Sequence, residues 1–226
     1  MPIVVRRQPS RAGSHYAGIH RRIWPMMLRA LRWRMFNKPP GWLYLTAFSA
    51  VAGVILYWAS VPHWYVLEMF LVGLFFGLPL WVIWMIRFSM AMSNGTAQPR
   101  LMRWLVPVFI VAGVAVALVT DASLWLRFTI SKPSLEAYAR TVTAETSRDS
   151  TCQWVGLYQI CDAFPYLRLE DSEYVLGSAC LIGEEWAIDS NTSFVLLPVG
   201  EPEETADDSY RHLMGNWYGW HGWDHW

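Results

Sequence analysis

Three long apolar runs dominate the first half of the chain. They cover residues 43–60, 64–88 and 101–120, and the middle run contains only two charged residues, Glu68 near its start and Arg87 near its end. At a rise of about 1.5 Å per residue, a helix of about 20 residues crosses a bilayer core of about 30 Å. The pattern therefore predicts three transmembrane helices separated by short polar connections.

Small residues recur along these runs. Gly73 and Gly77 stand four residues apart in the middle run, Pro79 follows them, and Gly53 and Gly113 lie in the first and third runs. Small residues at this spacing let a neighbouring helix backbone approach closely, and a proline invites a kink. We expect these glycines to mark helix packing, either within the chain or across a homodimer.

After residue 121 the pattern becomes that of a small mixed domain. Leu135, Tyr138 and Val142 recur on one face of a helix expected to begin at Ser131-Lys132-Pro133 and to run to about Glu145. Strand-like segments follow, separated by Asp, Ser, Gly and Asn clusters, at 153–160, 165–170, 174–182, 186–189 and 193–197. The sequence therefore predicts an α-helical membrane protein with three transmembrane helices and a small α+β C-terminal domain.

Charge is sorted along the chain. Residues 1–42 carry nine Lys or Arg and no acid, whereas residues 121–226 carry six basic and 17 acidic residues. Because basic segments stay on the cytoplasmic side, the N-terminus is expected in the cytoplasm and the C-terminal domain outside the plasma membrane. The expected parts are a basic lead (1–40), a three-helix transmembrane domain (41–121) and an acidic extracytoplasmic domain with a Trp-rich tail (122–226).

The basic lead contains an amphipathic pattern. Trp24, Leu28 and Leu31 recur at helical spacing, while Arg22 and Arg29 fall away from that face. This pattern predicts a helix that lies on the cytoplasmic membrane surface and binds anionic lipid. A basic patch alone is not specific for nucleic acid, so adhesion to the lipid bilayer is favoured over nucleic-acid binding.

All cysteines of the chain, Cys152, Cys161 and Cys180, lie in the C-terminal domain. An extracytoplasmic location permits a disulfide. Cys152 and Cys161 flank what we predict to be one extended strand, which would hold them apart. The expected pair is therefore Cys161 with Cys180.

The C-terminal tail is rich in Trp, Gly and His. Its tryptophans recur at every third position, and its glycines oppose a helix. Indole rings favour the membrane interface, so we expect the tail to pack on the sheet or to rest on the outer leaflet; a stacking surface for envelope glycan is the alternative. The candidate binding residues are Trp217, Trp220, Trp223, Trp226 and His212.

Motifs for catalysis and metal binding are sparse. His221 and His225 are candidate metal ligands, but no Cys or Glu completes a recognised motif around them. The sequence contains no Gly-rich phosphate loop, GxSxG, HExxH or CxxC, so no catalytic residue and no cofactor is predicted. The centres of the three runs are apolar, which disfavours transport by this chain alone.

Two short motifs, Val155-Gly156-Leu157-Tyr158 and Asp208-Ser209-Tyr210-Arg211-His212-Leu213, stand before the Trp-rich end. Together with the three preceding runs they resemble a group of uncharacterised actinobacterial three-span membrane proteins with a small extracytoplasmic C-terminal domain. The resemblance implies this layout and no activity. The sequence favours a binding or assembly component of the cell envelope, with a membrane protein or a second copy as partner. The alternative is a membrane-anchored enzyme with its site near His212.

Overall fold

The computed structural model describes residues 39–95, 97, 101–143, 152–168, 173–183, 192–205 and 208–222. The chain divides into two compact units, Met1–Trp42 with Val82–Leu105 and Leu43–Trp81 with Val106–Trp226. The predicted helix of the basic lead lies outside the described residues.

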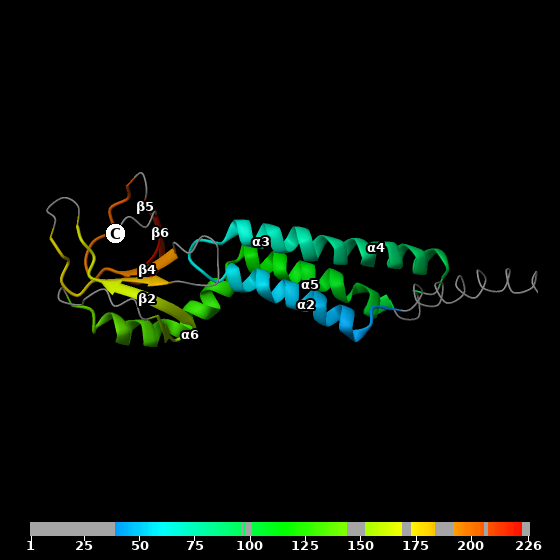
Figure 1. Cartoon of the computed structure of the whole chain (residues 1–226), viewed down its shortest axis with the longest axis horizontal. Helices are drawn as coiled ribbons and strands as arrows, with labels where there is room; N and C mark the ends of the chain where they lie inside the picture. Colours follow the sequence, from blue (N-terminus) through cyan, green and yellow to red (C-terminus); the bar gives the residue numbers. More distant parts are fainter. Residues whose placement is uncertain are drawn as a thin grey trace, which may run out of the picture. The chain divides into compact units, whose positions relative to one another are not determined.

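The three apolar runs are helical (Figure 1). The first is α2 (Trp42–Trp58), the second is a continuous helix made of α3 (Val66–Val72), η2 (Gly73–Gly77) and α4 (Leu78–Ser93), and the third is α5 (Leu101–Val119). Two of these helices are long and apolar enough to cross a membrane, Val66–Ser93 with 28 residues and α5 with 19. Helix α2 is apolar but shorter, with 17 residues.

Where Pro79 was expected to invite a kink, the structure has a wider helical turn. Residues Gly73–Gly77 are π-helical and directly precede the turn that contains Pro79. A proline ring clashes with the carbonyl four residues earlier in an α-helix, which is here that of Phe75 inside the π-helical segment. The wider turn accommodates the proline within one uninterrupted helix.

Among the described residues, no other helix backbone lies close to the glycines that were predicted to mark helix packing. A Cβ added at Gly53, Gly73 or Gly113 would meet no described atom within 4 Å, and one at Gly77 would meet only Val51 Cγ1 at 3.8 Å. The helices are instead separated by an apolar groove of about 490 Å³ lined by side chains of α2, α4 and α5 together with Gly73 and Gly77. Close backbone approach is therefore absent at these positions.

In the first unit, the second half of α4 packs against the start of α5. Trp84 Nε1 donates a hydrogen bond of 2.9 Å to the carbonyl of Trp104, and the Trp84 and Phe88 rings stack with centroids 5.2 Å apart. Ala91 and Ala97 are fully buried beside Trp104. The two indoles thus hold the second half of α4 against the start of α5.

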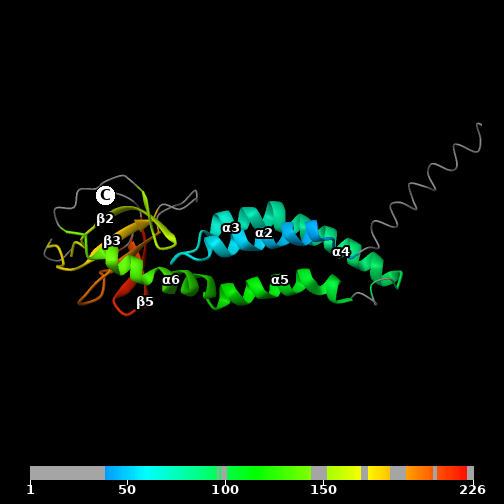
Figure 2. The same cartoon turned by 90° about the horizontal axis from the view of Figure 1, so that it is seen from below.

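In the second unit, the C-terminal domain is a six-stranded antiparallel sheet with one helix, α6 (Ala122–Ala139), along one face (Figures 1 and 2). The strand order is β1-β2-β3-β4-β6-β5. The strands are β1 (Gln153–Val155), β2 (Tyr158–Phe164), β3 (Ala179–Gly183), β4 (Thr192–Leu196), β5 (Asp208–Met214) and β6 (Trp217–Gly222). The mixed helix-and-sheet domain predicted for this part of the chain is confirmed.

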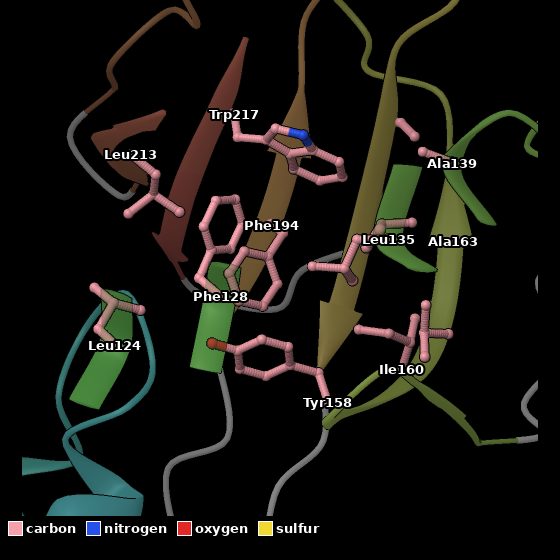
Figure 3. Close-up of a cluster of buried hydrophobic side chains, with 13 residues drawn as sticks. Leu124, Phe128, Leu135, Ala139, Tyr158, Ile160, Ala163, Phe194, Leu213 and Trp217 are labelled. Carbon is pink, nitrogen blue, oxygen red and sulfur yellow. The ribbon is translucent and has the colours of Figure 1, made fainter. Parts of the chain in front are cut away.

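The main core lies between α6 and the sheet (Figure 3). Phe128 of α6 stacks on Phe194 of β4, with centroids 5.7 Å apart, and meets Trp217 of β6 edge-on at 6.0 Å. Leu124 and Leu135 of α6 are fully buried in the same cluster. A second cluster, which includes Tyr166, Cys180 and Trp220, lies on the other face of the sheet.

The boundaries of α6 differ from the prediction. The helix begins at Ala122 rather than at Ser131 and continues through Pro133 to Ala139. Ser131 faces inward instead of capping a helix: it is fully buried, and its Oγ accepts a hydrogen bond of 2.9 Å from the Leu157 amide. A fixed contact with the sheet thus replaces the expected capping role.

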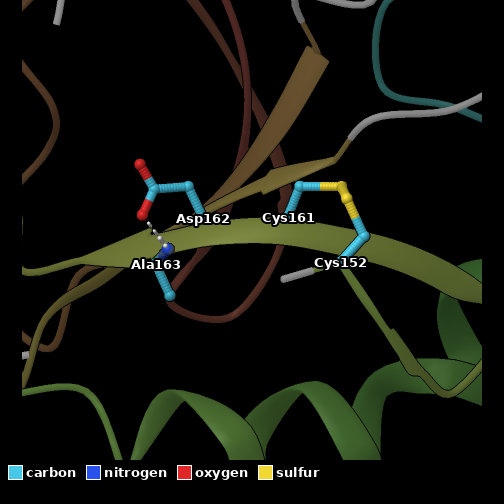
Figure 4. Close-up of a disulfide and its surroundings, with 4 residues drawn as sticks. All are labelled: Cys152, Cys161, Asp162 and Ala163. Carbon is cyan, nitrogen blue, oxygen red and sulfur yellow. Dashed lines mark hydrogen bonds between the residues drawn. A yellow bond between two sulfur atoms is a disulfide. The ribbon is translucent and has the colours of Figure 1, made fainter. Parts of the chain in front are cut away.

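The predicted pairing of Cys161 with Cys180 is wrong. Residues 153–160 are not one strand but a hairpin, in which β1 and β2 are joined at Gly156-Leu157. The register that places Gln153 opposite Ile160 brings Cys152 beside Cys161, and these two form the disulfide (Figure 4). Cys180 is unpaired and buried, and burial raises the pKa of its thiol to about 12.

Other strand predictions had mixed outcomes. Strand β4 confirms the segment at 193–197, and β3 confirms the second half of 174–182. Residues 165–168 form only the isolated bridge Leu167–Tyr174, and the segment at 186–189 lies outside the described residues. Strands β5 and β6 were not predicted, although they form the largest hairpin of the sheet.

Candidate functional site

Chemistry-bearing side chains gather where the connection between α2 and α3 meets β5 and β6. Pro62 packs on Gly219 so closely that a Cβ at Gly219 would overlap the proline ring. The ring of the next residue, His63, stacks on that of His221 with a centroid distance of 5.3 Å. Gly219 and His221 are two residues apart on β6 and so share one face of the sheet. The connection is therefore seated on that face.

Asp121 ties the same connection to the sheet from the corner between α5 and α6. Its backbone is left-handed, with a φ of 50°, a conformation that Asp adopts more readily than most residues. Its Oδ1 accepts a hydrogen bond of 3.2 Å from Trp64 Nε1, and its Oδ2 forms an ion pair with Arg211 of β5. Arg211 Nη1 also donates to the Pro62 carbonyl at 3.4 Å.

These groups border a cleft of about 520 Å³. Residues 62–68 form one side of it, and Arg211 and His221 form the other. Glu68, in the first turn of α3, lines the cleft although only 4% of its surface is exposed. The cleft thus combines a guanidinium, a carboxylate and two imidazoles at the start of the long apolar helix.

The environment of His63 keeps its imidazole neutral at pH 7. Burial, and to a smaller extent the nearby groups His221 and Arg211, lower the pKa of His63 from 6.5 to about 4, against a hydrogen bond to the Gly219 carbonyl that raises it. Nε2 is buried and has no hydrogen-bond partner among the described residues. The nitrogen that donates to Gly219 is therefore Nδ1, and in the neutral ring Nε2 is an acceptor.

A second set of contacts centres on Arg127 of α6, which is buried. Its Nη1 donates to Ser60 Oγ at 2.8 Å, and its Nη2 donates to the Leu157 carbonyl at 2.7 Å. The guanidinium also lies over the rings of Tyr57 and Tyr158, 4.8 and 4.1 Å from their centroids. One side chain thus joins the end of α2, helix α6 and the β1–β2 turn.

His212, the residue expected near an enzyme site, lies outside the cleft. It is exposed on β5, where its Nε2 contacts the Gly215 carbonyl at 2.9 Å and its ring meets that of Tyr218 edge-on. Tyr210 lies two residues earlier on the strand, and burial raises the pKa of its phenol.

The tryptophan tail is part of the sheet as far as it is described. Trp217 and Trp220 are separated by three positions in β6, so their side chains point to opposite faces. Trp217 joins the core under α6, Trp220 joins the other cluster, and both are buried. These two indoles are therefore not part of an exposed stacking surface, which was the alternative to packing on the sheet or resting on the outer leaflet. Trp223 and Trp226 lie outside the described residues.

The predicted metal ligands are not brought together by the described part of the chain. His221 lies in a strand beside His63, and His225 is outside the described residues. No group of three His, Cys, Asp or Glu side chains among the residues with described positions is placed to hold a metal ion. The ring of His221 stacks on that of His63 at the cleft.

The residues of the cleft, apart from His221, were not predicted as site residues. Glu68 and Asp121 were visible as acids at the ends of apolar runs, but only the fold brings Arg211 to them, 90 positions after Asp121. Comparisons with protein-family models, with curated proteins and with solved structures found no match. The site is therefore interpreted from its own geometry.

Proposed function

We propose that this chain is a plasma-membrane protein that crosses the bilayer three times and holds its sheet domain on the extracytoplasmic face, as a binding or assembly component of the cell envelope. The two long apolar helices support two crossings. Helix α2 supports the third, because Tyr44 near its start donates a hydrogen bond of 2.6 Å to the carbonyl of Leu80 in the long helix. A helix joined to a spanning helix by a short connection lies antiparallel beside it.

Charge and redox chemistry support the orientation. The nine basic residues and no acid of residues 1–42 favour a cytoplasmic N-terminus, and an odd number of crossings then places the acidic part outside. The disulfide between Cys152 and Cys161 fits an oxidising compartment.

The observation that carries the proposal is the set of side-chain contacts between the helix ends and the sheet domain. Arg127 bonds Ser60 and Leu157, and the Tyr158 hydroxyl donates to the Ser60 carbonyl at 3.0 Å. Asp121 adds its contacts with Trp64 and Arg211. Such contacts hold the domain in a fixed position at the end of the helices, as a display or assembly function requires.

Exposed apolar side chains offer a surface for a partner. Leu176 is 97% exposed and Val199 is 77% exposed. The loops that carry them touch, because a Cβ at Gly177 would lie 3.4 Å from Pro198 Cγ. Glu201 and Glu204 are exposed close by in the sequence. Contiguous exposed apolar side chains rimmed by charge are typical of protein interaction sites.

The test is position-specific crosslinking in native membranes. A photo-crosslinking residue at Leu176 should give a reproducible adduct with an envelope protein. The same residue at Ala137, which is exposed on α6, should not give that adduct, since it lies on a different element. Equal adducts at both positions, or none at Leu176, would argue against the binding function.

A further inference from the structure

The cleft beside α3 combines opposite charges with the beginning of an apolar helix. Arg211 and His221 come from the sheet, while Glu68 comes from the first turn of α3. We propose that this cleft binds the zwitterionic headgroup of an aminophospholipid, with the phosphate at Arg211 and His221 and the ammonium at Glu68 and His63. The proposal rests on the proposed function in one respect, namely that α3 enters the membrane.

The size of the cleft fits such a group. Its volume of about 520 Å³ falls within the range of about 300–1,000 Å³ that is usual for small-ligand sites. Its walls combine apolar residues such as Pro62 and Val66 with a small number of polar groups. This composition suits a ligand with a charged head and an apolar remainder.

The phosphate side is formed by Arg211. A guanidinium carries five N–H groups in a planar fork that matches phosphate geometry. Nη1 of Arg211 donates to the Pro62 carbonyl and Nη2 donates to Asp121. Nε donates no hydrogen bond to a described residue. Asp121 also fixes the position of the guanidinium, so that little side-chain freedom is lost when a phosphate binds.

The ammonium side is formed by Glu68 and His63. The Glu68 carboxylate is buried, and the attraction between a carboxylate and an ammonium group is stronger in a buried site than in water. His63 Nε2 is a buried acceptor with no hydrogen-bond partner in the described structure. A primary ammonium group has three N–H donors and can serve both, whereas a trimethylated ammonium group has none.

The start of α3 provides a path for the acyl chains. Val66, Leu67 and Phe70 are all more than half exposed and follow directly from the cleft. Large exposed apolar side chains on a spanning helix face lipid tails. A headgroup in the cleft would therefore have its chains beside α3.

The experiment measures which lipid stays with the purified full-length protein. Protein in nanodiscs of equimolar phosphatidylethanolamine, phosphatidylcholine and phosphatidylglycerol is released and its bound lipid is measured by native mass spectrometry. The phosphatidylethanolamine adduct should dominate. In Glu68→Gln its excess should fall by about tenfold, because a charge-assisted hydrogen bond is lost. Glu136→Gln, which changes a carboxylate paired with Lys132 on α6, should keep the wild-type preference.

A second variant covers the case in which Glu68→Gln fails to fold. His63→Gln should weaken the preference over phosphatidylcholine, whereas His212→Gln, outside the cleft, should not. Equal retention of the three lipids by the wild-type protein, or an unchanged preference in folded Glu68→Gln, would overturn the proposal. Tighter binding of soluble glycerophosphoethanolamine than of the lipid would overturn the lipid as the source of the headgroup.

The result is separable from the proposed function. Both leaflets of the disc contain the same lipids, so lipid retention does not depend on which side of the membrane the sheet domain occupies. That side is measured by reporter fusions, and the envelope partner is measured by crosslinking at Leu176.

Discussion

Asp121 combines two roles at the scale of a single residue. Its left-handed backbone ends α5 and starts α6, and its two carboxylate oxygens hold Trp64 and Arg211. A short acidic side chain suits both roles, since Asp tolerates positive φ and accepts two hydrogen bonds. The residue that turns the chain out of the apolar helix therefore also fixes the sheet domain beside it.

Gly156 is constrained by both its backbone and its surroundings. Its φ is +65°, and an added Cβ would lie 2.7 Å from the Cβ of Ser131. We expect Gly156→Ala to lower the free energy of unfolding by about 2–4 kcal/mol, from left-handed strain and overlap with α6. Denaturant titration of the purified protein in detergent measures this loss.

Gly215→Ala is the matched control for Gly156→Ala. Gly215 has a similar φ of +62°, but a Cβ there would meet no described atom within 4 Å. Only the backbone strain remains, so the loss should be about 1 kcal/mol. Equal losses in the two variants would show that the contact with Ser131 is unimportant.

His63 makes stability depend on pH. Its pKa is about 4 in the folded protein against 6.5 for an unperturbed histidine, so below pH 6.5 the unfolded chain binds a proton that the folded chain does not. Stability should therefore fall as the pH drops from about 6.5 to about 4 and level off below that pH. Protonation would place a positive charge beside the guanidinium of Arg211, with Glu68 as the facing carboxylate.

Thermal unfolding of the purified protein at pH 7.5 and pH 4.5 measures this effect. His63→Gln should lose part of the pH dependence, whereas His212→Gln should keep it. An identical loss of melting temperature in wild type and His63→Gln would refute the assignment to His63.

At the scale of elements, the β1–β2 hairpin is closed by its disulfide. The double variant Cys152→Ser/Cys161→Ser should be less stable by about 2–3 kcal/mol, because the cross-link restricts the unfolded chain over a short loop. Without reductant, the folded wild-type protein should have no thiol that reacts with an alkylating reagent, and the denatured protein should have one, Cys180. Mass spectrometry counts the alkyl groups; two further reactive thiols after denaturation would mean that the disulfide is absent.

The helices, which have a continuous hydrophobic pattern, were predicted from the sequence. The strands that are joined by short turns were not. The three apolar helices and the mixed domain followed from hydrophobic periodicity, and α5 ends one residue from the predicted position. Both hairpins were missed because their strands are joined by two residues, Gly156-Leu157 and Gly215-Asn216. A Gly-Asn pair between two runs of alternating apolar and polar residues indicates a hairpin, so β5 and β6 could have been predicted from the sequence.

The cleft was less predictable than the helices. It joins residues 62–68 to Arg211 and His221. No local sequence pattern predicts a contact between residues so far apart in the chain. The error at Cys161 has the same origin as the missed hairpins, because reading 153–160 as one strand separated two cysteines that the turn brings together. Pro133 caused a different error. Proline is common at the first position of a helix, so a helix start was predicted there, whereas α6 begins earlier and continues through Pro133.

At the scale of the whole molecule, Arg127 joins the end of α2 to the sheet domain. Arg127→Met should lower the free energy of unfolding by about 2–4 kcal/mol, because the Leu157 carbonyl and the Ser60 hydroxyl lose a buried donor. Arg127→Lys should lose less, since it keeps the charge but cannot span both acceptors. Denaturant titration in detergent compares the two; equal stability of Arg127→Met and wild type would contradict a fixed junction.

In the proposed topology, the chain crosses the membrane three times and displays the sheet domain outside. The most direct measurement fuses each terminus in turn to a reporter that is active only outside the cytoplasm and to one that is active only inside. We expect the C-terminal fusion to be active with the outside reporter alone and the N-terminal fusion to be active with the inside reporter alone. A C-terminal fusion active only in the cytoplasm would contradict this topology, because the sheet domain would then lie on the same side as the basic lead.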